Sequence, residues 1–199
     1  MIENISNIAD AGIPIFGYNW MPSHVWRTDP VTIRGGAIAT AFDYDIAKQI
    51  PNTHDREYTE EELWKNLENW IKIITPIAEK KNIKLGIHPC DPPVENLGGI
   101  PQLFRSFDSY KKLINIVDSP SNAIEFCQGT FSEMADASGE GIYEMIDYFS
   151  KRKKILYVHF RNVSGTVPKF NEEFINSGYV DMYRAMKIYY KNGFDSFFI

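Results

Sequence analysis

Long apolar runs, a surplus of basic residues and a cysteine framework are all missing from this 199-residue chain. No apolar stretch approaches the roughly 18 residues of a membrane-spanning helix, and the opening "MIENISNIAD" has no basic or apolar signal-peptide region. The net charge is -5 with scattered lysines and arginines, which argues against nucleic acid as a partner. Two cysteines are too few for a disulfide framework. We expect a cytoplasmic protein with no membrane or nucleic-acid partner.

What the chain does contain is an alternation of β-rich runs and helical patterns. Strands are expected over 13–18, 83–87, 122–127, 155–160 and 194–199. Helices are expected over 2–10, 60–81, 108–117, 139–151 and 179–191. The second of these helices opens with Thr59 and Glu62, which is typical of a capping box. Near-continuous apolar strands separated by helices predict a parallel sheet covered by helices.

The spacing of the strands indicates the kind of parallel sheet. The last four predicted strands begin at residues 83, 122, 155 and 194, and no Gly-x-Gly-x-x-Gly motif follows the first strand. This favours an incomplete (β/α)8 TIM barrel, with about five parallel strands and intervening helices, over a doubly wound sheet. A complete barrel needs about 250 residues and eight strands. We therefore expect residues 1–199 to form a single partial TIM-barrel domain, cut at both ends.

Three of the predicted strands end on residues that ligate metals. The strand at 83–87 is followed by His88, the strand at 122–127 ends in Cys127, and His159 closes the run that begins at residue 155. The carboxyl ends of barrel strands converge on one mouth, where active sites lie. Imidazole and thiolate both donate lone pairs to metals. The pattern therefore predicts a metal site, although a lone histidine or buried cysteine is more often a packing residue.

Loops after the strands supply further candidates. Asp91, in "HPCDPP", either orients the His88 imidazole or caps the turn. The stretch 19–37 has no regular pattern and is expected to be a loop that covers the substrate, or else a structural Ω-loop. Arg161 lies two residues past His159, where a guanidinium suits a substrate carboxylate, with an ion pair inside the barrel as the alternative.

Several longer motifs carry a family resemblance. They are "GIHPCDPP", "EFCQGTFSEM", "YVHFRNVSGTVPKFNE" and "SGYVDMYRAMK", with "GYNWMP" and "RGGA" near the start. Together they resemble the mannonate dehydratases, sugar-acid lyases with a xylose isomerase-like barrel. The resemblance covers essentially the whole chain.

The resemblance implies an activity and a metal. The family reaction is the metal-dependent dehydration of D-mannonate to 2-dehydro-3-deoxy-D-gluconate in hexuronate (glucuronate) catabolism. The implied ion is Mn2+ (or Fe2+), and the ligands that carry over are His88, Cys127 and His159. A thiolate by itself would suggest zinc or ferrous iron, so the preference for manganese comes only from the family.

The substrate contacts are expected as follows. Arg161 grips the sugar acid as the candidate catalytic residue, Arg27 or Arg34 helps from the preceding loop, and Tyr18 and Asn19 line the mouth.

The chain departs from the family in two ways. Cys90 stands where the family usually has Asp, and the Asp-His pair that supplies the fourth ligand and an acid–base group would follow Ile199. Two other functions therefore stay open: an incomplete fragment that binds metal weakly or only self-associates, and a sugar isomerase or epimerase. Exposed strand edges at the cut ends predict a homo-oligomer, as a dimer.

Overall fold

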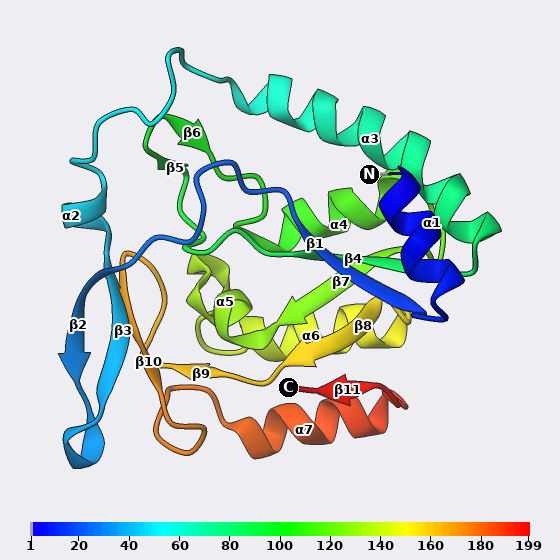
Figure 1. The fold of residues 1–199 in the computed structure, drawn as a ribbon. Helices are drawn as coiled ribbons and strands as arrows, with labels where there is room; N and C mark the ends of the chain where they lie inside the picture. The colour runs from blue at the N-terminus through cyan, green and yellow to red at the C-terminus, as the bar shows by residue number, and fades with distance from the viewer. Residues whose placement is uncertain (1) are drawn as a thin grey trace.

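The chain forms a parallel sheet flanked by helices, and a smaller antiparallel sheet (Figure 1). The structure is a computed structural model that describes residues 2–199. The parallel sheet contains β1 (Ile15–Asn19), β4 (Lys84–His88), β7 (Asn122–Cys127), β8 (Ile155–His159) and β11 (Phe197–Phe198). The longer helices are α1 (Ile2–Asp10), α3 (Glu60–Lys80), α4 (Phe107–Ile116), α6 (Gly141–Lys151) and α7 (Met182–Lys191). The shorter helices are α2 (Tyr44–Ala47), α5 (Gln128–Glu133) and the 3-10 turns η1 (Arg34–Gly36) and η2 (Ala135–Ala137).

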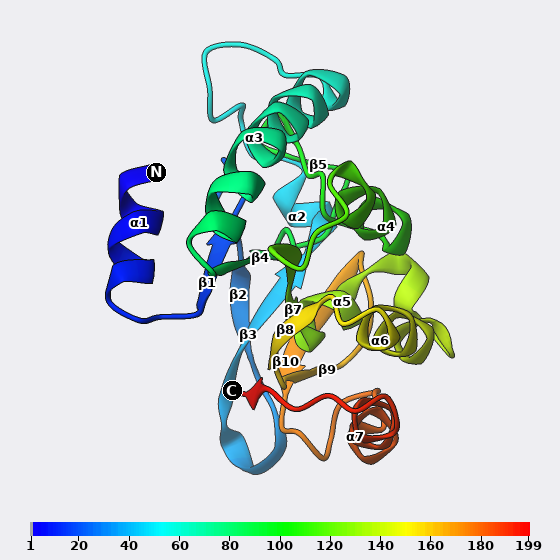
Figure 2. The ribbon, with the colours of Figure 1, turned by 90° about the vertical axis from the view of Figure 1, so that its right-hand side faces the viewer.

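The parallel sheet is an incomplete TIM barrel, as predicted. Its strand order is β1-β4-β7-β8-β11, and each neighbouring pair is parallel. All five predicted strands and all five predicted helices are present, with boundaries that differ by a few residues. The helices lie on the outer side of the curved sheet (Figure 2). No helix within residues 2–199 is both long enough and apolar enough to cross a bilayer.

Aromatic side chains fill the space between the sheet and its helices. Phe126 on β7 stacks on Phe131 of α5, with ring centroids 4.0 Å apart and planes 14° apart. Tyr110 and Phe149 pack against the same pair, and all four are fully buried. Every residue of α5 is buried although most of them are polar, so this helix has no solvent-exposed face and its sequence shows no amphipathic pattern. Sequence periodicity therefore did not predict α5.

A second sheet lies beside the carboxyl ends of the parallel strands (Figure 1). Its strands, in the order β2-β3-β10-β9, are β2 (Thr28–Thr32), β3 (Ile38–Asp43), β10 (Lys169–Glu173) and β9 (Asn162–Val163). A separate two-stranded sheet pairs β5 (Asn96–Leu97) with β6 (Ile100–Pro101). The prediction that 19–37 has no regular structure is therefore wrong. β2 is an edge strand with an irregular register around Pro30, and this interruption hid the strand pattern.

The start of α3 is capped differently from the prediction. The Thr59 hydroxyl accepts a hydrogen bond from the backbone N–H of Glu62, at 3.1 Å, as expected for an N-cap. The Glu62 carboxylate does not reach back to Thr59 and instead pairs with Arg56 at 2.6 Å. Only one half of the capping box is therefore formed.

Candidate metal centre

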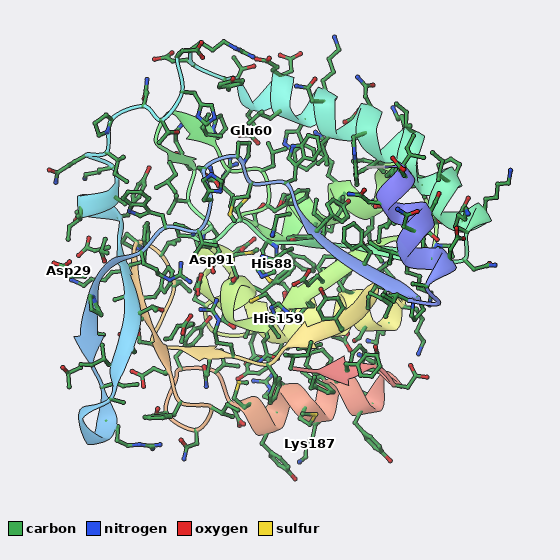
Figure 3. The ribbon with its side chains drawn as sticks, in the orientation of Figure 1. Asp29, Glu60, His88, Asp91, His159 and Lys187 are labelled. Atoms are coloured by element: carbon green, nitrogen blue, oxygen red, sulfur yellow. The ribbon has the colours of Figure 1, made fainter. Side chains whose placement is uncertain are left out.

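The three predicted ligands meet at the mouth of the partial barrel. His88 ends β4, Cys127 ends β7 and His159 ends β8, and Cys127 and His159 are register partners on adjacent strands. One donor atom from each of the three residues lies within 4.8 Å of the others. Figure 3 shows His88 and His159 close to each other at the carboxyl ends of the strands. Parallel pairing brings these ends together because the three strands finish at the same edge of one sheet.

A cavity of about 460 Å³ opens onto these residues. Its walls include the three donors, the predicted residues Asn19 and Arg161, and three carboxylates, from Asp91, Glu125 and Glu172. A larger hollow of about 750 Å³ lies between α3 and α4. Among residues 2–199, however, the only cluster of three metal-donor side chains is the one at the barrel mouth. We therefore take the smaller cavity as the candidate site.

A backbone carbonyl orients the His88 ring. Its Nδ1 lies 2.7 Å from the carbonyl oxygen of Pro89. A carbonyl only accepts hydrogen bonds, so Nδ1 carries a hydrogen and Nε2 is the nitrogen left to bind a metal.

The three donors also stabilise each other's charges. Burial alone would lower the pKa of His88, but interactions with Cys127 and Glu125 raise it to about 9. The hydrogen bond with Cys127 raises the pKa of His159 as well. Burial would raise the pKa of the Cys127 thiol, but the two imidazoles and Arg161 hold it well below its usual value. These neighbours favour the thiolate of Cys127, the form that binds metals.

Arg161 is held in a network of acidic and hydroxyl groups. Its guanidinium lies 2.9 Å from Glu133, 2.9 Å from the Thr130 hydroxyl and 3.6 Å from Asp91, and it also pairs with Glu172. Burial opposes the charge, but these carboxylates and the nearby thiolate raise its pKa above its usual range. Arg161 therefore forms ion pairs inside the barrel, which was one expectation. It also borders the cavity, where the other expectation places a substrate carboxylate.

Glu133 makes this network unusual. Its side chain is fully buried, Oε1 pairs with Arg161, and Oε2 has no hydrogen-bond partner among residues 2–199. Burial and the neighbouring Asp91 raise the pKa of Glu133, although Arg161 partly offsets them.

Asp91 takes a role that differs from both predictions. Its carboxylate accepts two hydrogen bonds from Arg27, at 2.7 and 2.8 Å, instead of orienting His88 or capping the turn. Burial would raise the pKa of Asp91, but Arg27 and Arg161 lower it. Arg27 comes from the segment before β2, so this bidentate ion pair ties the second sheet to the loop after β4.

Two other predicted contact residues lie away from the cavity. Arg34 is on the surface, where it donates a hydrogen bond to Asn176 at 2.8 Å. Tyr18 packs its ring 4.8 Å from that of Trp70 on α3. Side chains alternate along a strand, so Tyr18 faces the helices while Asn19 lines the cavity. Tyr18 and Arg34 therefore lie away from this cavity, and a substrate contact by either residue stays a prediction.

Sequence reasoning missed Glu125, Glu133 and Glu172. Glu125 stands two residues before Cys127 on a strand, so period-two alternation could have placed it on the same face. Glu133 lies on the unpredicted α5 and Glu172 on the unpredicted β10, and no local pattern marks either residue.

The donor set fits a divalent transition metal. Two imidazoles and a thiolate suit zinc or ferrous iron, whereas manganese usually prefers oxygen ligands. His88 and Cys127 are buried or nearly so, while the half-buried His159 leaves the site open toward the cavity. An open position of this kind is typical of a catalytic metal site rather than a structural one.

The opposite pKa shifts of Cys90 and Cys127 give a direct test of the assignment of Cys127 as the thiolate. Burial raises the pKa of Cys90 to about 12, whereas that of Cys127 is lowered. In the chelator-treated chain we expect thiolate ultraviolet absorbance to persist as the pH falls from 9 to 7. Cys127→Ala should remove this absorbance and Cys90→Ala should keep it. A signal that titrates near the ordinary cysteine pKa of about 8.5 would contradict the assignment.

Comparison with known proteins identifies the family of this chain. Residues 52–198 match the family model described as D-mannonate dehydratase (UxuA). A mannonate dehydratase of Streptococcus uberis is 32% identical over 222 residues, which cover 98% of this chain and 63% of that protein. Related mannonate dehydratases of Lactococcus lactis strains are 27 and 28% identical. The chain thus spans under two thirds of the length of these relatives.

Solved structures give the same result. The crystal structure of mannonate dehydratase from Streptococcus suis serotype 2 superposes with a TM-score of 0.89 at 32% identity, over 99% of this chain and 59% of that one. A xylose isomerase-like TIM barrel protein from Mycobacterium smegmatis gives a TM-score of 0.61 at 14% identity, over 99% of this chain and 58% of that one, and this shows the fold alone. Sequence and structure together place this chain in the mannonate dehydratase family.

Proposed function

We propose that this chain takes part in the metal-dependent dehydration of D-mannonate to 2-dehydro-3-deoxy-D-gluconate, a step of hexuronate catabolism. The observation that carries the proposal is the cluster of His88, Cys127 and His159 at the barrel mouth, with the Arg161 guanidinium beside it. Family membership supports the reaction and the sugar-acid substrate. We also propose that residues 1–199 act as one partial-barrel domain, because the second sheet is tied to the mouth through Arg27.

In this proposal His88, Cys127 and His159 hold Mn2+ or Fe2+. When bound, the ion supplies a Lewis acid for the negative charge that develops next to the substrate carboxylate. The chain's own contribution is to place these three donors within 4.8 Å of one another at adjoining strand ends. Ferrous iron matches the thiolate better, while manganese is the ion implied by the family resemblance.

The other residues of the cavity would bind and orient the sugar acid. The planar guanidinium of Arg161 can donate two parallel hydrogen bonds to a carboxylate. Glu172 pairs with one of its two terminal nitrogens. We propose that the substrate carboxylate replaces Glu172, whose side chain is 36% exposed, while the buried Glu133 and Asp91 keep the guanidinium in place. Asn19 lines the opposite wall, where its amide can bond a sugar hydroxyl. Dehydration then requires removal of the C2 proton and protonation of the departing C3 hydroxyl.

The two alternative functions have less support. Sugar isomerisation or epimerisation would rest on structural neighbours that are at most 14% identical, which share only the fold. An inactive fragment would not require a buried thiolate, two oriented imidazoles and an arginine to remain together around one cavity.

Metal binding and turnover test the proposal in one sample. We expect the chain to bind Mn2+ or Fe2+ in calorimetry and to release 2-dehydro-3-deoxy-D-gluconate from D-mannonate. Cys127→Ala should weaken binding by about 100-fold or more, because one ligand of three is lost, and should abolish turnover. Cys90→Ala is the matched control and should bind metal normally. Equal binding by Cys127→Ala and the unmodified chain would contradict the proposed site.

Replacing Arg161 tests the substrate contact. Arg161→Lys keeps the charge but loses the two-pronged geometry, so we expect kcat/KM for D-mannonate to fall about 10- to 100-fold, mostly through KM. Arg184→Lys is the control, since Arg184 pairs with Glu140 on the surface. Metal affinity should be unchanged in both variants. An unchanged KM in Arg161→Lys would show that the carboxylate binds elsewhere.

The proposed assembly is a homodimer. The outer strands β1 and β11 each have one neighbour in the described sheet, and apolar residues beside these edges are exposed, including Ile13 (49%), Phe197 (67%) and Ile199 (75%). A second copy would cover these edges. Light scattering after size-exclusion chromatography should give twice the mass of one chain. A compact monomer at micromolar concentration would contradict the dimer.

A further inference from the structure

Glu125 is a buried carboxylate that the proposed reaction leaves without a role. It lies on β7 two residues before Cys127, so both side chains point into the barrel. Only 10% of its side chain is exposed, and its Oε1 lies 3.2 Å from Nε2 of His159. A buried carboxylate is costly unless it is paired, so this contact accounts for part of its stability in the interior.

A small network holds the Glu125 carboxylate in place. The Tyr157 hydroxyl donates a hydrogen bond to Glu125, and burial together with this contact raises the pKa of Tyr157. Gly17 on β1 leaves the space that the pair occupies, because a Cβ at this position would overlap both the Tyr157 hydroxyl and Glu125 Oε2. Three strands of the parallel sheet therefore contribute to the position of one carboxylate beneath the candidate metal centre.

The two histidines of the centre show the same arrangement. His88 directs Nδ1 to the carbonyl oxygen of Pro89, and His159 directs Nε2 to Glu125. Carbonyl and carboxylate oxygens accept hydrogen bonds, so each of these nitrogens carries a hydrogen. The other nitrogen of each ring is the one left to bind a metal, which it does after losing any proton it carries. Metal-binding histidines generally donate their second N–H to such an acceptor, which fixes the tautomer and orientation of the ring.

We propose that Glu125 is a positioning residue of the metal centre: it accepts the hydrogen of His159 Nε2 and leaves Nδ1 as the donor to the ion, while Tyr157 fixes Glu125. This inference rests on the proposed function, since it requires that the centre binds a metal. Glu125 acts through His159 and not as a ligand, because the donors within 4.8 Å of one another comprise His88, Cys127 and His159 without Glu125.

Cobalt titration of the full chain tests this role without any assay of turnover. Co2+ bound by a thiolate gives a charge-transfer band, so both affinity and ligation are read from one spectrum. Glu125→Gln should weaken Co2+ binding about 10- to 100-fold and keep the thiolate band and the ligand-field bands. Glu140→Gln is the control, because it removes one negative charge from the surface, and its affinity should match that of the unmodified chain.

Two further variants perturb Glu125 without changing it. Tyr157→Phe removes the hydrogen bond that holds the carboxylate, and Gly17→Ala displaces both side chains through their flexible ends. Both should lower Co2+ affinity in the same direction as Glu125→Gln, by smaller factors. If circular dichroism shows that Glu125→Gln does not fold, Tyr157→Phe and Gly17→Ala test the role of Glu125 in its place.

The outcomes separate this inference from the proposed function. If the unmodified chain binds Co2+ through its thiolate and all three variants bind it equally well, the role of Glu125 is overturned and the metal centre stands. If Glu125→Gln changes the ligand-field bands, Glu125 is a ligand and the positioning role is also overturned. If the unmodified chain binds no Co2+, the metal centre fails, and the inference fails with it.

Discussion

The contact between one thiolate and two imidazoles at adjoining strand ends is the interaction on which the rest of the site depends. Parallel pairing of β4, β7 and β8 brings His88, Cys127 and His159 together, so the sheet that gives the fold also assembles the donors. Burial opposes each charge singly, yet together they shift one another toward the charged forms. The backbone therefore places the three donors together, and binding of a metal ion would displace the protons that the imidazoles carry.

The second constraint is the concentration of charge beside that cluster. Arg161 and Arg27 offset the acidic groups of the loop after β4, α5 and β10, and these ion pairs join different elements of the chain. Buried ion pairs contribute little net stability, because desolvation cancels much of the attraction. Their benefit here is geometric, since they fix the guanidinium at the wall of the cavity and tie the antiparallel sheet to the barrel mouth.

The sequence predicted the parts of this structure that have regular local patterns. Apolar runs and helical periodicity located the parallel strands and their helices, and strand-end chemistry identified His88, Cys127 and His159 as neighbours. It did not predict α5, which is buried on all sides, or the antiparallel sheet, whose edge strand contains Pro30. Glu133 and Glu172, two partners of Arg161, come from those elements, and no local pattern in the sequence reports such long-range contacts.

The most direct test of the account is metal-edge X-ray absorption on the chain loaded with ferrous iron or manganese. The account predicts one sulfur and two imidazole nitrogens around the ion, with oxygen donors completing the shell. Cys127→Ala should lose the sulfur contribution. This reads the ligands directly and does not depend on activity. A shell made of oxygen and nitrogen alone, identical in the two proteins, would contradict the claim that His88, Cys127 and His159 form the metal centre.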